Sequence, residues 1–377
     1  MFFHEPTAHT PGGEGFWVLT RHGDILRAAA SAELSSHCGG LRRDGGTLIE
    51  DLPSGFAAGV LLNMMDDPHH QEIRRLALPS VTPKALARFQ PELARRARAI
   101  VDAAVDKGQC DFLLDVAAEL PLQAIAELMG IPQDDRHRLF AWAEATLDYG
   151  DRELGESSPA TIEANAAMFE YGQRLLDERR AAPEPGDDIL SPVVRNDIAT
   201  EPEQQMFFNL LIAAGTETTR NSIAVGAMAL VEHPDQWRAL RDDRSLLGTA
   251  TEEILRWASS TAYNRRTATT DVDIGGHHVC AGDKVTLWWA SANRDDDAFA
   301  DPFRFDVRRD PNPHLAFGHG THFCLGANLA RLEIRLVLDA LLDRVDHLEL
   351  AGAPEWTRSN KHTGLRHLPM ALVPISR

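Results

Sequence analysis

A single cysteine in a glycine-rich loop is the feature that most constrains this chain. Residues 317–326 read Phe-Gly-His-Gly-Thr-His-Phe-Cys-Leu-Gly and lead directly into a helical pattern over residues 327–333. A cysteine at a helix N-terminus faces unpaired N–H groups and the positive end of the helix dipole, which favour the thiolate. Gly320 permits a tight turn, and Gly326 leaves room for a flat ligand over the sulfur. The loop therefore predicts a soft, anionic metal ligand at Cys324.

The ordinary interpretation of a lone cysteine is a small buried apolar residue, and we expect this of Cys38, Cys110 and Cys280. The four cysteines show no paired spacing, so we expect a reducing compartment, with neither a disulfide framework nor a zinc site. The spacing around Cys324 is different. With 15 Phe, 27 Gly and 4 Cys in 377 residues, roughly one such chain in a thousand would contain Phe-x-x-Gly-x-x-x-Cys-x-Gly by chance.

Composition indicates a compact soluble protein. No linker, repeat or low-complexity run divides the 377 residues, and an apolar content of 44% suffices for a large core. No segment approaches the roughly 20 apolar residues of a membrane span, and the N-terminus lacks the features of a signal peptide. The formal charge of −18 argues against nucleic acid as a partner. We therefore expect a cytoplasmic protein with no nucleic-acid partner and no membrane span.

Three helical stretches hold polar residues that invite a functional interpretation. His70 and Arg74 share one helix face, although a solvated basic face would look the same. A long apolar helix over residues 203–231 contains a glycine, a glutamate and three threonines, which is costly in propensity and desolvation. Its threonines could simply bond back to carbonyls one turn earlier and bend the helix. Glu253 and Arg256 have the spacing of a surface ion pair.

The Cys324 loop resembles the haem-binding loop of the cytochrome P450 family, the haem-thiolate monooxygenases. The family's His-x-x-x-Arg, Ala-Gly-x-Glu-Thr-Thr and Glu-x-x-Arg motifs also occur, in the family's order, at residues 70–74, 214–219 and 253–256. The resemblance implies an α+β fold, in which residues 1–377 form one large, mostly helical domain with a small β-sheet subdomain. The part before Trp17 is shorter than is usual for the family.

The resemblance implies haem b as the cofactor, with Cys324 as the thiolate ligand of its iron. Basic side chains would hold the haem propionates, namely His70, Arg74, Arg266 and His322. Three more residues would contact the haem, namely Phe317, Gly326 and Ala214. Arg265, next to Arg266, is expected to be exposed.

The same resemblance assigns oxygen chemistry to the helix over residues 203–231. Thr218 would be the alcohol that stabilises bound oxygen, and Glu217 the acid that passes protons inward. Because Thr218 lies one turn after Ala214, its hydroxyl can reach the Ala214 carbonyl. The Glu253–Arg256 pair would be buried and structural, with Arg304 as its second arginine.

The chain has neither a dinucleotide-binding fingerprint after a strand nor an iron–sulfur cysteine set. Electrons from NAD(P)H are therefore expected to arrive through a ferredoxin reductase and a ferredoxin. Arg331, with Arg74, Arg75 and Arg335 nearby by family geometry, would form a basic docking patch for the acidic ferredoxin.

The implied reaction is O2-dependent hydroxylation of an unactivated C–H bond in a hydrophobic small molecule, with a sterol or terpenoid suspected. Alternatives are a tailoring oxidase of a polyketide or peptide natural product, a haem-thiolate peroxygenase or isomerase, and a non-catalytic haem sensor. Substrate contacts are expected from residues 140–169, 259–264 and 360–364. Residues 273–279, Asp-Ile-Gly-Gly-His-His-Val, predict a β-hairpin.

Overall fold

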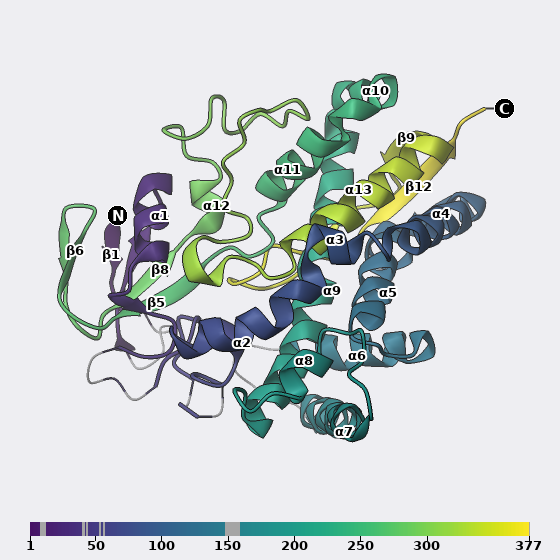
Figure 1. The fold of residues 1–377 in the computed structure, drawn as a ribbon. Coiled ribbons are helices and arrows are strands. Elements are labelled where there is room, and N and C mark those ends of the chain that lie inside the picture. The colour runs from purple at the N-terminus through teal and green to yellow at the C-terminus, as the bar shows by residue number, and fades with distance from the viewer. Residues whose placement is uncertain are drawn as a thin grey trace.

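Helices make up most of the molecule, and a small sheet region lies at one side (Figure 1). The computed structural model describes residues 1–7, 13–39, 42, 44–52, 54–55, 57–147 and 159–376. The helices are α1 (His22–Ala30), α2 (His69–Ala77), α3 (Pro83–Leu86), α4 (Gln90–Lys107), α5 (Glu119–Leu128), α6 (Arg136–Leu147), α7 (Pro159–Ala181), α8 (Ser191–Val194), α9 (Glu201–Glu232), α10 (Pro234–Asp242), α11 (Leu247–Ala258), α12 (Trp289–Ala292) and α13 (Ala327–Arg344). The strands are β1 (Phe2–His4), β2 (Phe16–Leu19), β3 (Leu34–Ser35), β4 (Gln109–Asp111), β5 (Asn264–Ala268), β6 (Val272–Ile274), β7 (His277–Val279), β8 (Lys284–Leu287), β9 (Val345–Leu350), β10 (Glu355–Trp356), β11 (Leu365–His367) and β12 (Pro369–Pro374). This architecture confirms the predicted fold class.

Helix α9 runs through the helical part of the molecule and organises its packing (Figure 1). It begins with a capping box, in which Thr200 and Glu203 each accept a hydrogen bond from the other's backbone N–H. Apolar residues all around the helix are buried, among them Phe207, Phe208 and Ile223, which is typical of a helix enclosed by others. Helices α5, α7, α11 and α13 pack against it. The long helix predicted over residues 203–231 is thereby confirmed.

A five-stranded sheet with the order β1-β2-β8-β5-β3 forms the other part of the molecule. Strand β2 pairs with β8 in parallel, and β5 is antiparallel to both β8 and β3. A second apolar cluster lies between this sheet and α1, and includes Leu19, Ile25 and Val285. In the interior strand β5, residues Arg265 to Ala268 are all buried, so both of its arginines lie inside the protein.

Strands β6 and β7 confirm the predicted hairpin over residues 273–279. Gly275 and Gly276 form its two-residue turn with φ of 56° and 79°, a backbone conformation that glycine adopts without strain. None of the described helices combines the length and the apolar composition that a membrane crossing requires.

Candidate active site

The loop before α13 owes its shape to two glycines with positive φ, Gly318 at 69° and Gly320 at 74°. A Cβ at Gly320 would stand only 2.7 Å from the carbonyl oxygen of Ala29 in α1, so the predicted tight turn also needs glycine for space. The Cys324 N–H donates to the Phe317 carbonyl at 2.9 Å, which closes the loop just before α13 begins. The cysteine thus lies at a helix N-terminus, as predicted.

The Cys324 side chain is exposed, yet burial raises the pKa of its thiol. An exposed residue and a desolvated thiol are compatible if the sulfur points into a recess whose walls are formed by the protein. The Gly326 N–H and the charges of Arg74 and Arg331 act in the opposite direction, but burial outweighs them. The N–H groups at the helix start therefore do favour the thiolate, as predicted, but burial of the sulfur by the surrounding protein has the larger effect on its pKa. A bound metal ion would supply the missing positive charge, because coordination deprotonates a thiol outright.

Two of the predicted propionate ligands, His70 in α2 and His322 in the loop, lie against each other with ring centroids 4.2 Å apart. His322 Nε2 is 3.0 Å from Ser36 Oγ, and His70 Nδ1 is 3.1 Å from Asp67 Oδ1. Burial, followed by the charge of Arg266, lowers the pKa of His322 to about 2. His322 is therefore a neutral hydrogen-bonding group in the protein chain at pH 7.

The other two, Arg74 and Arg266, bring positive charge to the same region. Arg74 donates to the Phe323 carbonyl at 2.6 Å. Arg266 is 4% exposed and donates to the Arg265 carbonyl at 2.9 Å, and burial lowers its pKa to about 10. Within the described part of the chain, neither guanidinium has a carboxylate partner. A buried guanidinium without a counter-charge is costly, so the pair suits a ligand with carboxylate groups.

The middle of α9 presents two residues that are more accessible than their neighbours. Ala214 is exposed and Thr218 is half-buried, whereas Thr216 and Glu217 are 3% and 4% exposed. The Thr218 hydroxyl donates to the Ala214 carbonyl at 3.1 Å, as predicted, and Thr216 bonds back to the Ile212 carbonyl at 2.9 Å. The back-bonding leaves α9 uninterrupted, and one face of the helix remains open beside Thr218.

Two serines hold the backbone at Thr218. Ser260 belongs to the segment 259–264 that was predicted to contact substrate, whereas Ser222 was assigned no role. The Thr218 carbonyl accepts hydrogen bonds from Ser222 Oγ at 2.8 Å and from Ser260 Oγ at 3.0 Å. The two hydroxyls are also 2.9 Å from each other. Ser260 follows α11, so these bonds fix the segment after α11 against the open part of α9.

Another residue that the sequence did not assign individually is His362, in the turn before β11. An isolated antiparallel bridge joins His362 to Thr261, and His362 Nδ1 lies 4.0 Å from Glu217 Oε1. Burial and the neighbouring charge of Lys361 lower the pKa of His362 to about 4. This contact joins residues that are far apart in the sequence, so no local sequence pattern predicts it.

The buried ion-pair network was predicted with the wrong second arginine. Glu253 and Arg256 are fully buried and form two bonds of 2.7 Å, as predicted. The arginine that joins them is Arg309, whose Nε lies 3.1 Å from Glu253 Oε2. The side chain of Arg304 is 64% exposed and only 4.0 Å from Asp306. Arg304 contributes its backbone carbonyl instead, which accepts from both Arg256 and Arg309.

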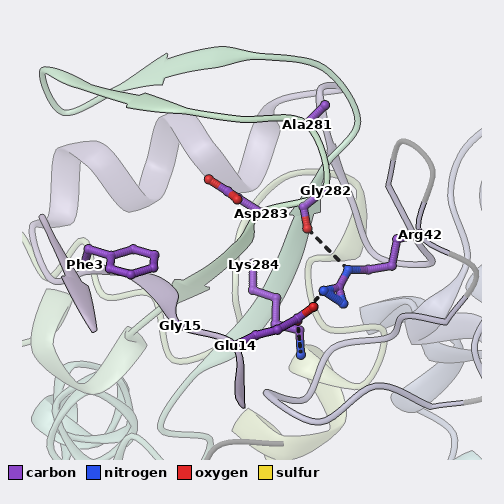
Figure 2. A pocket seen from close by; sticks show the side chains of 8 residues that line it. All are labelled: Phe3, Glu14, Gly15, Arg42, Ala281, Gly282, Asp283 and Lys284. Atoms are coloured by element: carbon purple, nitrogen blue, oxygen red, sulfur yellow. Dashed lines mark hydrogen bonds and ion pairs between the residues drawn. The ribbon is translucent and has the colours of Figure 1, made fainter. Parts of the chain in front are cut away.

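The prediction that Arg265 is exposed is also wrong. Its side chain is fully buried and forms a 2.6 Å ion pair with Asp51. Asp51 also lies 3.1 Å from the buried Lys284 of β8, and Glu14 pairs with both Lys284 and Arg42. Figure 2 shows Glu14, Arg42 and Lys284 among the residues that line a surface hollow of about 570 Å³. Because carboxylates already balance its cations, we interpret this hollow as structural support rather than as the active site.

Arg331, the centre of the predicted docking patch, is engaged within the protein. It forms a two-pronged ion pair with Glu252 at 2.7 and 2.8 Å and lies 4.6 Å from the ring of Phe317. Arg75 and Arg335 are exposed, so their positive charges are more accessible to a docking partner than that of Arg331. Of the segment 140–169 predicted to contact substrate, residues 148–158 lie outside the described residues.

The model of the family described as "Cytochrome P450" matches residues 162–371. "Putative cytochrome P450 126" of Mycobacterium tuberculosis is 46% identical, over 99% of this chain and 91% of its own length. The methyl-branched lipid omega-hydroxylase of the same organism is 38% identical over 97% of this chain and 86% of its own. The steroid C26-monooxygenase of Mycolicibacterium smegmatis is 37% identical over 94% of this chain and 83% of its own.

Solved structures agree with these relatives. A Mycobacterium marinum cytochrome P450 in complex with pseudoionone has a TM-score of 0.89 at 34% identity, covering 98% of this chain and 91% of its own. HmtN, a post-tailoring hydroxylase involved in himastatin biosynthesis, has a TM-score of 0.82 at 30% identity, covering 95% of this chain and 91% of its own. The chain therefore belongs to the cytochrome P450 family of haem-dependent monooxygenases.

Proposed function

We propose that this monooxygenase hydroxylates an unactivated C–H bond of a hydrophobic, sterol- or terpenoid-like molecule, with electrons from NAD(P)H delivered by a ferredoxin reductase and a ferredoxin. The observation that carries the haem chemistry is the exposed residue Cys324 at a helix N-terminus, in a region where Arg74 and Arg266 have no carboxylate partner among the described residues. The substrate class is supported by the names of relatives that act on a steroid and on a methyl-branched lipid.

The donor set fits haem. Cys324 would ligate the iron. Gly326, where a Cβ would stand 4.0 Å from the Cys324 sulfur, would leave space beside this sulfur for the cofactor. His70, Arg74, Arg266 and His322 would bind the propionates, and Phe317 and Ala214 would contact the macrocycle. When bound, haem supplies the iron at which O2 is activated, with the thiolate as electron donor.

Proton delivery is assigned to the open face of α9. The Thr218 hydroxyl donates its proton to the Ala214 carbonyl, so its oxygen lone pairs remain available to accept a hydrogen bond from another group. Glu217, one residue earlier, lies beside His362. Because the lowered pKa keeps His362 neutral at pH 7, its imidazole lies beside the Glu217 carboxyl group as an uncharged polar group that can orient it. We assign Thr218 and Glu217 as catalytic residues and His362 as a positioning residue.

The ligation proposal is tested by spectroscopy. Reduced protein exposed to carbon monoxide should show the red-shifted Soret band of thiolate ligation, and Cys324→Ser should lose it. A folded wild-type protein with the spectrum of histidine ligation would disprove the assignment of Cys324.

The proton-delivery proposal is tested by the ratio of product formed to NADPH consumed. Thr218→Ala should keep haem content and substrate binding but divert electrons to hydrogen peroxide, because productive protonation is lost. Thr216→Ala is the matched control, since it removes a buried hydroxyl with the same type of back-bond. If both variants keep the wild-type ratio, Thr218 only shapes the helix. Glu217→Gln should slow turnover and increase the solvent isotope effect.

The substrate proposal is tested by a spin-shift screen with steroids, methyl-branched lipids, terpenoid ketones and peptide or polyketide intermediates. Tailoring of a natural product is the second candidate, because HmtN is a structural neighbour. Turnover with NADPH, ferredoxin and ferredoxin reductase supports the monooxygenase. Turnover with peroxide alone would indicate a peroxygenase, and ligand binding without any turnover would indicate a sensor.

A further inference from the structure

The hairpin formed by β6 and β7 has one face on the protein and one face in solvent. Val279 is fully buried, and Val272 and Ile274 pack on the apolar cluster of the sheet. Val272 pairs with Val279, and Asp273 pairs with His278. Since successive side chains alternate between the faces of a strand, the solvent face carries Asp271 and Asp273 from one side of the hairpin and His278 and Cys280 from the other. All four are exposed.

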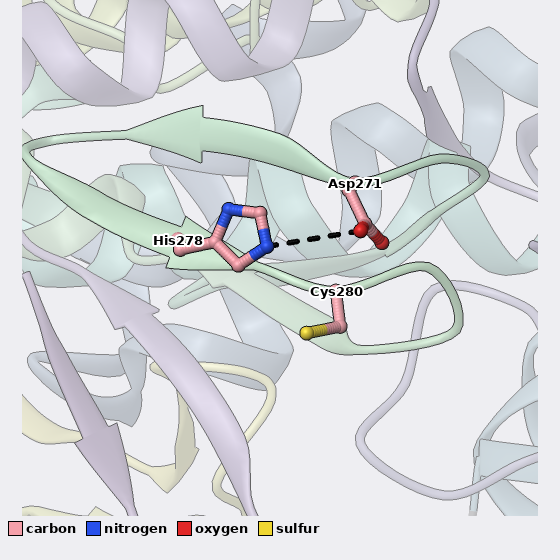
Figure 3. Close-up of side chains that lie close together, drawn as sticks. All are labelled: Asp271, His278 and Cys280. Atoms are coloured by element: carbon pink, nitrogen blue, oxygen red, sulfur yellow. Dashed lines mark ion pairs between the residues drawn. The ribbon is translucent and has the colours of Figure 1, made fainter.

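Three of these side chains converge. One ligand atom each from Asp271, His278 and Cys280 lies within 4.8 Å of the others, and His278 Nε2 is 3.7 Å from Asp271 Oδ2. Figure 3 shows the imidazole turned toward the Asp271 carboxylate, with the Cys280 sulfur beside it. Ligand atoms around one tetrahedral zinc ion lie about 3.3–3.8 Å apart. The three side chains therefore need only small rotations to share an ion.

Neighbouring groups already orient these side chains. Asp273 Oδ1 lies 3.2 Å from His278 Nδ1, which favours the tautomer with a proton on Nδ1 and a free lone pair on Nε2. Asp271 Oδ1 accepts a hydrogen bond from the Ala281 N–H at 2.8 Å, so Oδ2 is left for a ligand. A carboxylate behind a ligating histidine is a regular feature of protein zinc sites.

We propose that Asp271, His278 and Cys280 form a zinc-binding site, with water in the fourth coordination position. Thiolate and imidazole are the ligands that zinc prefers, whereas calcium and magnesium need oxygen ligands. Cys280 was expected to be buried; that expectation is wrong, because the residue follows β7 on the solvent face. The sequence shows no zinc-binding pattern because the three ligands come from the two sides of a hairpin and not from one Cys-x-x-Cys unit.

The test uses the haem-loaded protein, so that Cys324 is occupied, and Zn²⁺ alone as the probe. Equilibrium dialysis with elemental analysis should find one zinc per chain. X-ray absorption at the zinc edge should find one sulfur at about 2.3 Å and nitrogen or oxygen ligands at about 2.0–2.2 Å. Cys280→Ser should remove the sulfur signal. Asp273→Asn, which leaves all three ligands, should weaken binding by about 10- to 100-fold.

His277→Gln is the matched control, because His277 lies on the same hairpin but turns toward Trp17 on the other face. It should leave zinc affinity unchanged. The carbon monoxide spectrum of each variant checks that the fold and the haem site are intact. The proposal is overturned if no zinc binds, if the bound zinc has no sulfur ligand, or if binding is the same in Cys280→Ser and Asp273→Asn as in the wild type.

Discussion

Replacing Arg309 tests which arginine completes the buried Glu253 network. Arg309 lies 3.1 Å from the Glu253 carboxylate, and its side chain is 10% exposed. It also donates to three backbone carbonyls at 2.7–3.1 Å, those of Ala300, Asp301 and Arg304. Arg309→Ala removes all of these bonds together. Arg304→Ala is the matched control, because it removes an exposed arginine of the same segment.

The size of the effect follows from burial. Removing one partner of a buried ion pair costs about 3–5 kcal/mol. The lower end, about 3 kcal/mol, applies here, because Glu253 keeps its two bonds to Arg256. With an unfolding entropy of about 2.1 cal/mol/K per residue, 377 residues convert this loss into a fall in Tm of about 4 °C. The exposed Arg304, 4.0 Å from Asp306, should contribute less than about 0.5 kcal/mol.

The assay is thermal unfolding of the haem-loaded proteins by far-ultraviolet circular dichroism, at one scan rate. Arg309→Ala should melt about 4 °C below the wild type, and Arg304→Ala within about 1 °C of it. Arg309→Lys should fall between them, since lysine keeps the charge but not the planar fork. An Arg304→Ala protein that melts as low as Arg309→Ala would show that the assignment of the network is wrong.

Three further predictions concern docking, pH and proton delivery. Arg335→Glu should slow the reduction of this protein by ferredoxin and weaken the salt dependence of that rate. Arg238→Glu, on α10, is the control and should change neither. Equal stopped-flow reduction rates for Arg335→Glu and the wild type would disprove the docking face. Burial alone would raise the pKa of Glu252, but hydrogen bonds from His314 and Arg331 lower it to about 2. The stabilisation from this carboxylate is therefore present above pH 4.5 and lost as the pH falls toward 2. Glu252→Gln should cost up to about 3 kcal/mol at pH 7, and its Tm difference from the wild type should shrink below pH 4.5 and not above it. His362→Gln should slow turnover and leave the substrate-induced spin shift unchanged, because only proton delivery is affected; a lost spin shift would indicate a role in substrate binding instead.

Features set by neighbouring residues were predicted well from the sequence. The apolar residues of α9 lie within one segment, and the turn of the Cys324 loop depends on its own glycines. The back-bond from Thr218 to Ala214 follows from helical geometry alone. In each case the pattern lies within one segment of the chain, so the local sequence contains the information needed to predict it.

Features decided by distant segments were not predictable in this way. Arg265 and Arg266 are consecutive in β5, so one was expected to face solvent. Thr47 accepts a hydrogen bond from the Arg265 N–H, and Asp51 pairs with the Arg265 side chain, so residues 44–52 cover this arginine. Likewise, Arg304 and Arg309 lie in one irregular segment, and only its path in three dimensions decides which side chain reaches Glu253.

The pKa of Cys324 shows the same distinction in energetic terms. The helix N-terminus and the nearby arginines, which the sequence indicates, do act to stabilise the thiolate. Burial by the protein packed around the loop opposes this stabilisation of the thiolate. The segments that cause the burial lie elsewhere in the chain, so the sequence of the loop does not predict them. Because desolvation of a buried charge exceeds the effect of a helix dipole, the chain by itself holds a thiol. A bound iron would reverse this balance, so thiolate character at Cys324 should appear together with haem binding and not before it.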